Sequence, residues 1–270
     1  MAQGADNADV VVGMYTPMAA DYERIWAPLL RAYGLRLLDG LPLSGATRVL
    51  DLGCGVGVLL PDIAARAPGA LVVGVDLTEG MLRRAGPGAT VAVMDCTRLG
   101  FAEGSFDAIV SSFVVFHLPD PLGALKGVRA ILRPGGAFAL SVWGQRWDFP
   151  AGDAWGPILD AHGAGEDFAA EGPPDGEETV NAPEKLAGVL EGSGFTDVRV
   201  EASAWEQPWD LTAALDYGER MGSSRRRLAT LEPAARRAVV EEVRAAVVAM
   251  PADALVQRYE VVIGSGTAPG

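Results

Sequence analysis

Histidine and cysteine are scarce in this sequence, which has two of each among its 270 residues. Cys54 and Cys96 are too few for a disulfide scaffold and do not form a Cys-x-x-Cys pair. His117 and His162 form no His-x-x-x-His motif, and no paired acids have ligand spacing, so we expect no metal site. Two reduced thiols are typical of a cytoplasmic protein.

Basic side chains are in deficit as well, with 22 Lys and Arg against 35 Asp and Glu and a formal net charge of -13. Such a surface repels phosphate backbones and anionic lipids, so we expect neither a nucleic acid nor a membrane as partner. No apolar run approaches the roughly 20 residues that span a bilayer. Residues 1–12 lack the basic start and apolar stretch of a signal peptide. We expect a soluble, cytoplasmic protein, and the sequence leaves open whether it forms a homodimer.

The sequence does contain a strict alternation of short apolar strands and amphipathic helices. Apolar residues recur at helical spacing over residues 17–39, ahead of the first strand. Strands are expected at 48–52, 70–76, 90–95, 106–112, 137–142, 196–202 and 257–263, the last followed by a frayed Gly-Ser-Gly tail. Helices are expected at 58–66, 79–85, 121–132, 183–192, 211–221 and 232–250. Strands apolar on both faces and separated by helices indicate a parallel sheet that is covered on both sides.

The strongest motif is a glycine-rich loop after the first strand, Asp51-Leu52-Gly53-Cys54-Gly55-Val56-Gly57. Glycines at alternate positions allow a sharp turn and close approach of a ligand, and the helix that follows points its free N–H groups at the turn. Asp76 ends the second strand, about 20 residues later, where doubly wound folds place an acid that accepts ribose hydroxyls. The Gly-x-Gly-x-Gly spacing differs from the Gly-x-Gly-x-x-Gly of dinucleotide enzymes, and no Tyr-x-x-x-Lys pair is present, which disfavours a nicotinamide oxidoreductase.

This loop resembles motif I of the class I S-adenosylmethionine-dependent methyltransferases. Four further segments fit the family in order and spacing: Val75–Thr78, Met94–Cys96, Phe106–Ser112 and Leu132–Gly136. The chain is most similar to the type 11 group, which includes menaquinone and ubiquinone biosynthesis methyltransferases and many natural-product methyltransferases. The resemblance runs from about Tyr15 to Trp143 and more faintly to the last strand. It implies S-adenosylmethionine as the cofactor and a small organic acceptor molecule as the substrate.

The resemblance also assigns roles to individual residues. Gly53, Gly55 and Gly57 would cradle the methionine part of the cofactor, with Asp51 orienting the turn or reaching the amino group through water. Asp76 would hold the ribose, Leu77 would lie against the adenine, Asp95 would accept the adenine amino group, and the backbone N–H of Cys96 would bond the ring. Ser112 would lie beside the sulfonium and Tyr15 would close over the cofactor, while Cys54 belongs to the cofactor loop. For several of these residues a purely structural role is the alternative, such as local capping for Asp51 and a solvated strand end for Asp95.

His117 follows the fourth strand, at the carboxyl edge where doubly wound sheets bind ligands. With an ordinary pKa of about 6.5 it is a candidate general base, and the alternative is a residue that only shapes the pocket. Trp26, Trp147 and Trp155 are candidates to wall an apolar acceptor site, with core packing as the alternative. Trp143 is expected to be structural.

These expectations combine into an α/β fold with a Rossmann-like, seven-stranded, mostly parallel sheet and helices on both faces. We expect an N-terminal helical lid (1–45), a cofactor-binding core (46–143), an insertion over the active site (144–182) and a C-terminal part with a helical cap (183–270). The predicted function is methyl transfer to O, N or C of a small, largely apolar acceptor, in biosynthesis of a natural product or quinone-like molecule. The alternative keeps the fold and the cofactor but acts as a cyclase or binding protein. A structural or interaction protein is disfavoured, because it has no need of the glycine loop.

Overall fold

A computed structural model describes residues 7–167 and 176–270. The chain divides into two compact units. Unit 1 comprises residues 1–145, 173–203 and 261–270, and unit 2 comprises residues 146–172 and 204–260, in each case as far as the structure describes them. Within the described residues, the chain passes between the units in β5 (Leu132–Asp148), β6 (Thr196–Pro208) and β7 (Val256–Thr267).

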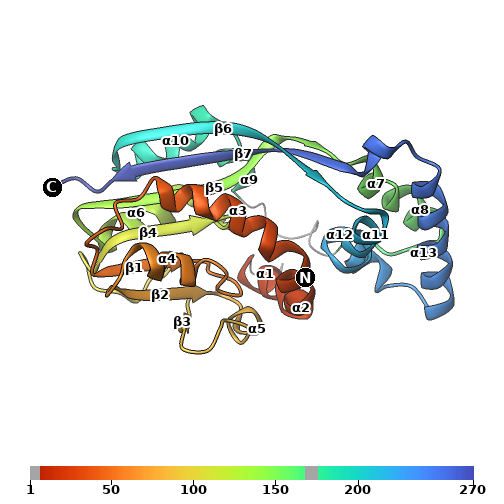
Figure 1. The fold of residues 1–270 in the computed structure, drawn as a ribbon, viewed down its shortest axis with the longest axis horizontal. Coiled ribbons are helices and arrows are strands. Elements are labelled where there is room, and N and C mark those ends of the chain that lie inside the picture. The colour runs from red at the N-terminus through yellow and green to blue at the C-terminus, as the bar shows by residue number, and fades with distance from the viewer. Residues whose placement is uncertain (1–6, 168–175) are drawn as a thin grey trace, which may run out of the picture. The chain divides into compact units, whose positions relative to one another are not determined.

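A seven-stranded sheet runs through the fold in the order β3-β2-β1-β4-β5-β7-β6 (Figure 1). Four neighbouring pairs are parallel: β1 with β2, β1 with β4, β2 with β3 and β4 with β5. The first four strands are β1 (Arg48–Leu52), β2 (Leu71–Asp76), β3 (Thr90–Val93) and β4 (Phe106–Ser112). This order confirms the predicted Rossmann-like, mostly parallel sheet. The order reverses between β1 and β4, and such switch points are where open α/β sheets bind ligands.

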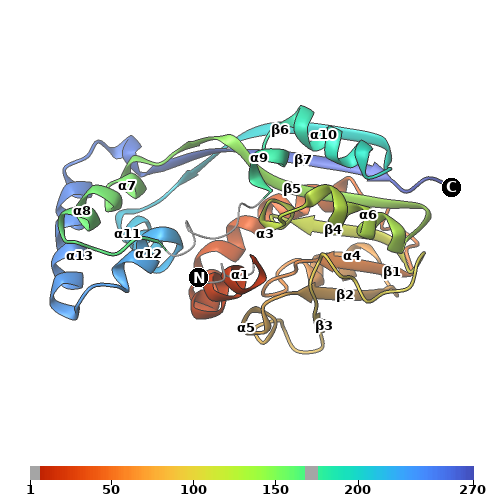
Figure 2. The same ribbon diagram turned by 180° about the vertical axis from the view of Figure 1, so that it is seen from behind.

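Helices cover both faces of the sheet in unit 1. The N-terminal elements are α1 (Asn7–Tyr15), η1 (Thr16–Met18), α2 (Ala19–Asp21), the π-helix η2 (Tyr22–Trp26) and α3 (Ala27–Asp39). The others are α4 (Leu60–Arg66), α5 (Glu79–Leu82), η3 (Val115–His117), α6 (Pro121–Ile131), α9 (Glu177–Val180) and α10 (Pro183–Gly192). Figure 1 shows α3 and α4 on the near face, and Figure 2 shows α6 and α10 on the other.

The core under α3 and α4 follows directly from the apolar pattern of the sequence. Leu37 and Leu38 of α3 and Ile63 of α4 pack with Val49 and Val110, and each of these side chains is at most 1% exposed. Apolar side chains three, four or seven residues apart share one face of a helix, so the sequence can present them together to the sheet. This packing fixes β1 and β4, and with them the loops at their carboxyl ends.

Unit 2 has a helical core of its own. Its elements are α7 (Pro150–Asp153), α8 (Trp155–Ala161), α11 (Leu211–Arg220), α12 (Gly222–Leu228), α13 (Pro233–Val248) and η5 (Ala252–Leu255). Trp155 of α8 packs in one cluster with Leu215 of α11 and with Val239 and Val243 of α13. The segment 144–182, predicted as an insertion, contains α7, α8 and α9, and its residues 168–175 lie outside the described part.

Three sequence expectations are corrected by the strands. β5 and β6 are much longer than predicted: β5 spans Leu132–Asp148 where 137–142 was expected, and β6 spans Thr196–Pro208 where 196–202 was expected. The Gly-Ser-Gly tail, expected to be frayed, belongs to β7, where Gly264 and Gly266 are buried against Leu186 and Phe195.

Of the described helices, none is both long and apolar enough to cross a membrane.

Candidate functional site

The glycine loop between β1 and α4 is held against β2 by backbone hydrogen bonds. The N–H groups of Gly53 and Cys54 both donate to the carbonyl oxygen of Val75, at 2.8 and 2.9 Å. Gly53 has φ of 73° and Gly55 has φ of 54°, in the left-handed region that favours glycine. A Cβ on Gly53 would lie 2.2 Å from Cγ2 of Val114, so the loop and the segment after β4 approach more closely than any side chain allows.

Asp76, at the end of β2, fixes the same loop from the other side. Its Oδ2 accepts the N–H of Gly55 at 2.8 Å, and its Oδ1 accepts the N–H of Thr78 at 2.8 Å. Burial raises the pKa of Asp76, and these hydrogen bonds oppose the rise. The carboxylate is partly exposed toward the pocket. Asp76 thus organises the loop and still faces the cavity.

Asp95 and Cys96 follow β3, the strand next to β2, and line the same pocket. Asp95 Oδ1 accepts both the backbone N–H and the hydroxyl of Thr97, at 2.8 and 2.7 Å. Burial would raise the pKa of Asp95, but these bonds and the contact of Arg98 with Oδ2 outweigh it and lower the pKa. Cys96 is buried, and burial raises the pKa of its thiol to about 12, so it stays protonated.

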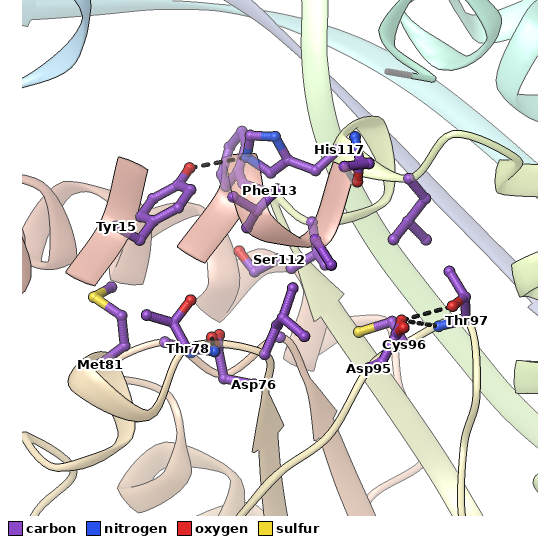
Figure 3. A pocket seen from close by; sticks show the side chains of 18 of the residues that line it. Tyr15, Asp76, Thr78, Met81, Asp95, Cys96, Thr97, Ser112, Phe113 and His117 are labelled. Carbon is purple, nitrogen blue, oxygen red and sulfur yellow. Dashed lines mark hydrogen bonds between the residues drawn. The ribbon is translucent and has the colours of Figure 1, made fainter. Parts of the chain in front are cut away.

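Tyr15 and His117 meet across the mouth of the pocket (Figure 3). The Tyr15 hydroxyl lies 2.8 Å from Nε2 of His117, which connects α1 to η3, and the two rings pack edge to face. His117 is exposed only in part, and the packed side chains around it exclude water and lower its pKa to about 4. Its imidazole is therefore neutral at pH 7 and can accept from or donate to Tyr15 according to its tautomer.

These residues line a pocket of about 140 Å³ that is open to solvent. The predicted residues that line it are Tyr15, Gly53, Gly55, Asp76, Leu77, Asp95, Cys96, Ser112 and His117. Asp51 and Cys54 line a smaller adjoining hollow together with Gly53 and Ser112. Gly57 borders neither, and a Cβ at this position would lie 3.0 Å from Cδ1 of Leu60 and 3.2 Å from Cβ of Ala85.

The three tryptophans predicted to face an acceptor do not line this pocket. Trp26 stacks on Trp143 with ring centroids 5.7 Å apart, and Trp143 packs on Phe113, which does line the pocket. Trp26 therefore packs behind the pocket wall, against Trp143. Trp155 is 1% exposed in the core of unit 2, because α8 turns it toward α11 and α13, and this burial does not support contact with a substrate. Trp147 is 47% exposed in unit 2, beside Tyr259.

Several pocket residues have no role in the sequence expectations, among them Val11, Tyr22, Thr78, Met81 and Phe113. Tyr22 lies seven residues after Tyr15, a two-turn helical spacing that could have suggested a shared face. Phe113 follows β4 with φ of 58°, a left-handed backbone that nothing in its local sequence indicates. The described residues include no group of three His, Cys, Asp or Glu side chains that could hold a metal ion.

Comparison with known proteins places this geometry in context. A family model described as a methyltransferase domain matches residues 50–140. Nocamycin O-methyltransferase from Saccharothrix syringae is 30% identical over 206 residues, which cover 69% of this chain and 72% of that protein. Aklanonic acid methyltransferase DauC from Streptomyces sp. (strain C5) is 34% identical over 141 residues, covering 48% of this chain and 64% of that one.

For several curated relatives the match spans less than two thirds of the relative's own length, between 26% and 64%. Among solved structures, the Haemonchus contortus phosphoethanolamine N-methyltransferase 2 in complex with S-adenosyl-L-methionine is similar in fold. Its TM-score is 0.57 at 18% identity, with 98% of this chain and 60% of that chain covered. At that identity the likeness concerns the fold alone.

Proposed function

Since the chain belongs to the S-adenosylmethionine-dependent methyltransferases, we propose that it transfers the cofactor's methyl group to a small, largely apolar organic acceptor, at oxygen, nitrogen or carbon. The observation that carries the proposal is the convergence of the glycine loop, Asp76 and Asp95 on one pocket at the carboxyl edge of the sheet. The biosynthetic context is that of a natural product or quinone-like molecule, as the names of relatives such as nocamycin O-methyltransferase suggest.

The residues of the pocket fit the chemistry of the cofactor. Asp76 offers a carboxylate to the ribose hydroxyls, and Asp95 offers acceptor oxygens for an adenine amino group. The turn at Gly53 and Gly55 leaves room that a Cβ would reduce, and two acids, Asp51 and Asp76, favour a cationic group beside it. When bound, S-adenosylmethionine supplies a methyl group that its sulfonium already activates.

The protein's task is then to align the acceptor and to exclude water. Apolar side chains also line the pocket, including Val11, Phe113, Val114 and Leu118, and they suit an apolar acceptor. A general base is required only when the methylated atom carries a proton that must leave.

We propose that His117 shapes the pocket and anchors Tyr15 rather than acting as that base. A base works best with a pKa near the operating pH, and burial lowers the pKa of His117 to about 4. Its Nε2 is also engaged with the Tyr15 hydroxyl, which lies on the helix expected to close over the cofactor.

Methyl transfer is tested with trideuteromethyl-labelled S-adenosylmethionine and a panel of phenols, hydroquinones and aromatic amines. Mass spectrometry should find an acceptor product that carries the label, and the Asp76→Asn variant should form far less of it. Conversion of a substrate without label, while the cofactor is bound but not consumed, would support the cyclase alternative and contradict this proposal. Loss of the labelled product in His117→Asn while Tyr15→Phe retains it would restore the base role of His117.

A further inference from the structure

The Asp51 carboxyl group is the most isolated acid in the site. It lies on β1 and is 2% exposed, and among the described residues no group donates a hydrogen bond to its Oδ2. The hollow that it lines holds the apolar side chains of Leu30, Val56, Val58 and Leu59, together with Cys54 and the hydroxyl-bearing Tyr22 and Ser112. A carboxylate in such surroundings is costly unless it gains a partner, so the neutral acid is favoured.

The groups that face Asp51 strengthen this preference. They are Asp76 from β2, Cys54 from the glycine loop and Tyr22 from the π-helix η2, with Tyr15 of α1 packed on Tyr22. No cation is among these described neighbours. Asp76 differs from Asp51 because each of its oxygens accepts a backbone N–H. Of two neighbouring acids, the one with these hydrogen bonds keeps its charge, and the other takes the proton.

We propose that Asp51 carries a proton in the ligand-free protein near neutral pH and releases it when an ammonium-bearing cofactor enters the site. The O–H bond of the carboxylic acid breaks, the proton goes to solvent, and the carboxylate that remains is compensated by the ammonium group of the ligand. This inference rests on the proposed function, since S-adenosylmethionine and S-adenosylhomocysteine both carry that ammonium group. Binding of the cofactor and ionisation of Asp51 are then one coupled event.

The direction of the pH dependence follows from the coupling. Burial, with a contribution from Asp76, raises the pKa of Asp51 to about 7, so lowering the pH stabilises the protonated form that the ligand must displace. Affinity should fall as the pH falls, by roughly 10-fold between pH 7 and pH 5.5. In that range the α-amino group of the ligand stays protonated, because its ordinary pKa is about 7.7 to 8.0. The loss of affinity is therefore assigned to the protein.

Titration calorimetry of the full chain with S-adenosylhomocysteine, at pH 6.5 in buffers of different ionisation enthalpy, counts the protons exchanged. The wild type should release between about half a proton and one proton per ligand bound. Asp51→Asn should release none and should bind with little pH dependence. The matched control is Asp153→Asn in unit 2, since Asp153 also has a raised pKa but does not line the pocket, and it should release as much as the wild type.

A second probe, 5′-methylthioadenosine, lacks the amino-acid part and should bind without releasing a proton. This comparison uses the wild type alone, so it decides the question even if Asp51→Asn does not fold. Binding of S-adenosylhomocysteine without proton release, or equal release by the wild type and Asp51→Asn, would overturn the coupling and leave the proposed function standing. Failure of S-adenosylhomocysteine to bind at any pH would instead overturn the proposed function, and the coupling with it.

Discussion

Replacing Gly53 by alanine adds a methyl group at the point where the glycine loop approaches the segment after β4. Two costs add up. The backbone has φ of 73°, which costs an alanine about 1–2 kcal/mol, and the new Cβ would lie 2.2 and 2.8 Å from the two Cγ atoms of Val114. Overpacking of this kind costs typically about 1–3 kcal/mol, so the free energy of unfolding should fall by about 2–5 kcal/mol.

The chain offers a matched control at Gly45, which has φ of 82° and nothing within 4 Å of its added Cβ. Gly45→Ala should therefore lose only the backbone part, about 1–2 kcal/mol. Urea unfolding followed by tryptophan fluorescence measures both variants. The double variant Gly53→Ala/Val114→Ala should be more stable than the sum of its single changes predicts, because shortening Val114 removes the clash.

A loss of unfolding free energy in Gly53→Ala no larger than that in Gly45→Ala would refute the close approach of Gly53 and Val114. It is equally refuted if the changes at Gly53 and Val114 are additive, since a contact between them must couple them. A loss in Gly53→Ala that the double variant does not relieve would assign the cost to backbone strain alone.

Three further outcomes are expected. Asp76→Asn should raise the Kd for S-adenosylhomocysteine roughly 10- to 100-fold in calorimetry, since a hydrogen bond to a charged group contributes about 1.5–3 kcal/mol, and an unchanged Kd would contradict the ribose assignment. Tyr15→Phe should lower the free energy of unfolding by about 0.5–1.5 kcal/mol, because it removes the hydrogen bond to His117. In the wild type, NMR should show His117 titrating near pH 4, and a pKa above 6 would contradict its burial. The pKa of Asp51 is raised to about 7 in the fold, so ionisation of Asp51 destabilises the ligand-free protein more and more as the pH rises from the pKa of the unfolded chain to about 7. The free energy of unfolding of Asp51→Asn, measured in urea, should therefore increase relative to that of the wild type by about 2 kcal/mol between pH 5 and pH 8. No such increase would argue against a buried, unpaired acid.

The sheet could be predicted from the sequence where strands are apolar on both faces and end at clear signals. The predicted bounds of β1, β4 and α10 are those of the structure. An exposed arginine and the glycine loop mark the two ends of β1, and a proline marks the start of α10. The core of unit 2 could not be predicted in this way. Helical periodicity in residues 211–221 and 232–250 reveals an apolar face but not which partner buries it, and the structure buries both against α8.

The candidate site, like the fold, could be predicted only in part from the sequence. Gly53, Gly55, Asp76 and Asp95 belong to local motifs, so their positions around one pocket could be anticipated from the chain order of a parallel sheet. Phe113 could not, because a left-handed aromatic residue arises from packing rather than from a local pattern. The place of Trp155 could not be predicted either, because a tryptophan in a glycine-rich segment is equally compatible with a core and with a binding site.

The central claim is that this pocket is built for S-adenosylmethionine, and calorimetry tests it most directly. The purified chain is titrated with S-adenosylhomocysteine and, separately, with NAD. We expect one-to-one binding of S-adenosylhomocysteine, weakened in Asp76→Asn, and no binding of NAD. Binding of NAD without S-adenosylhomocysteine, or binding of neither, would contradict it.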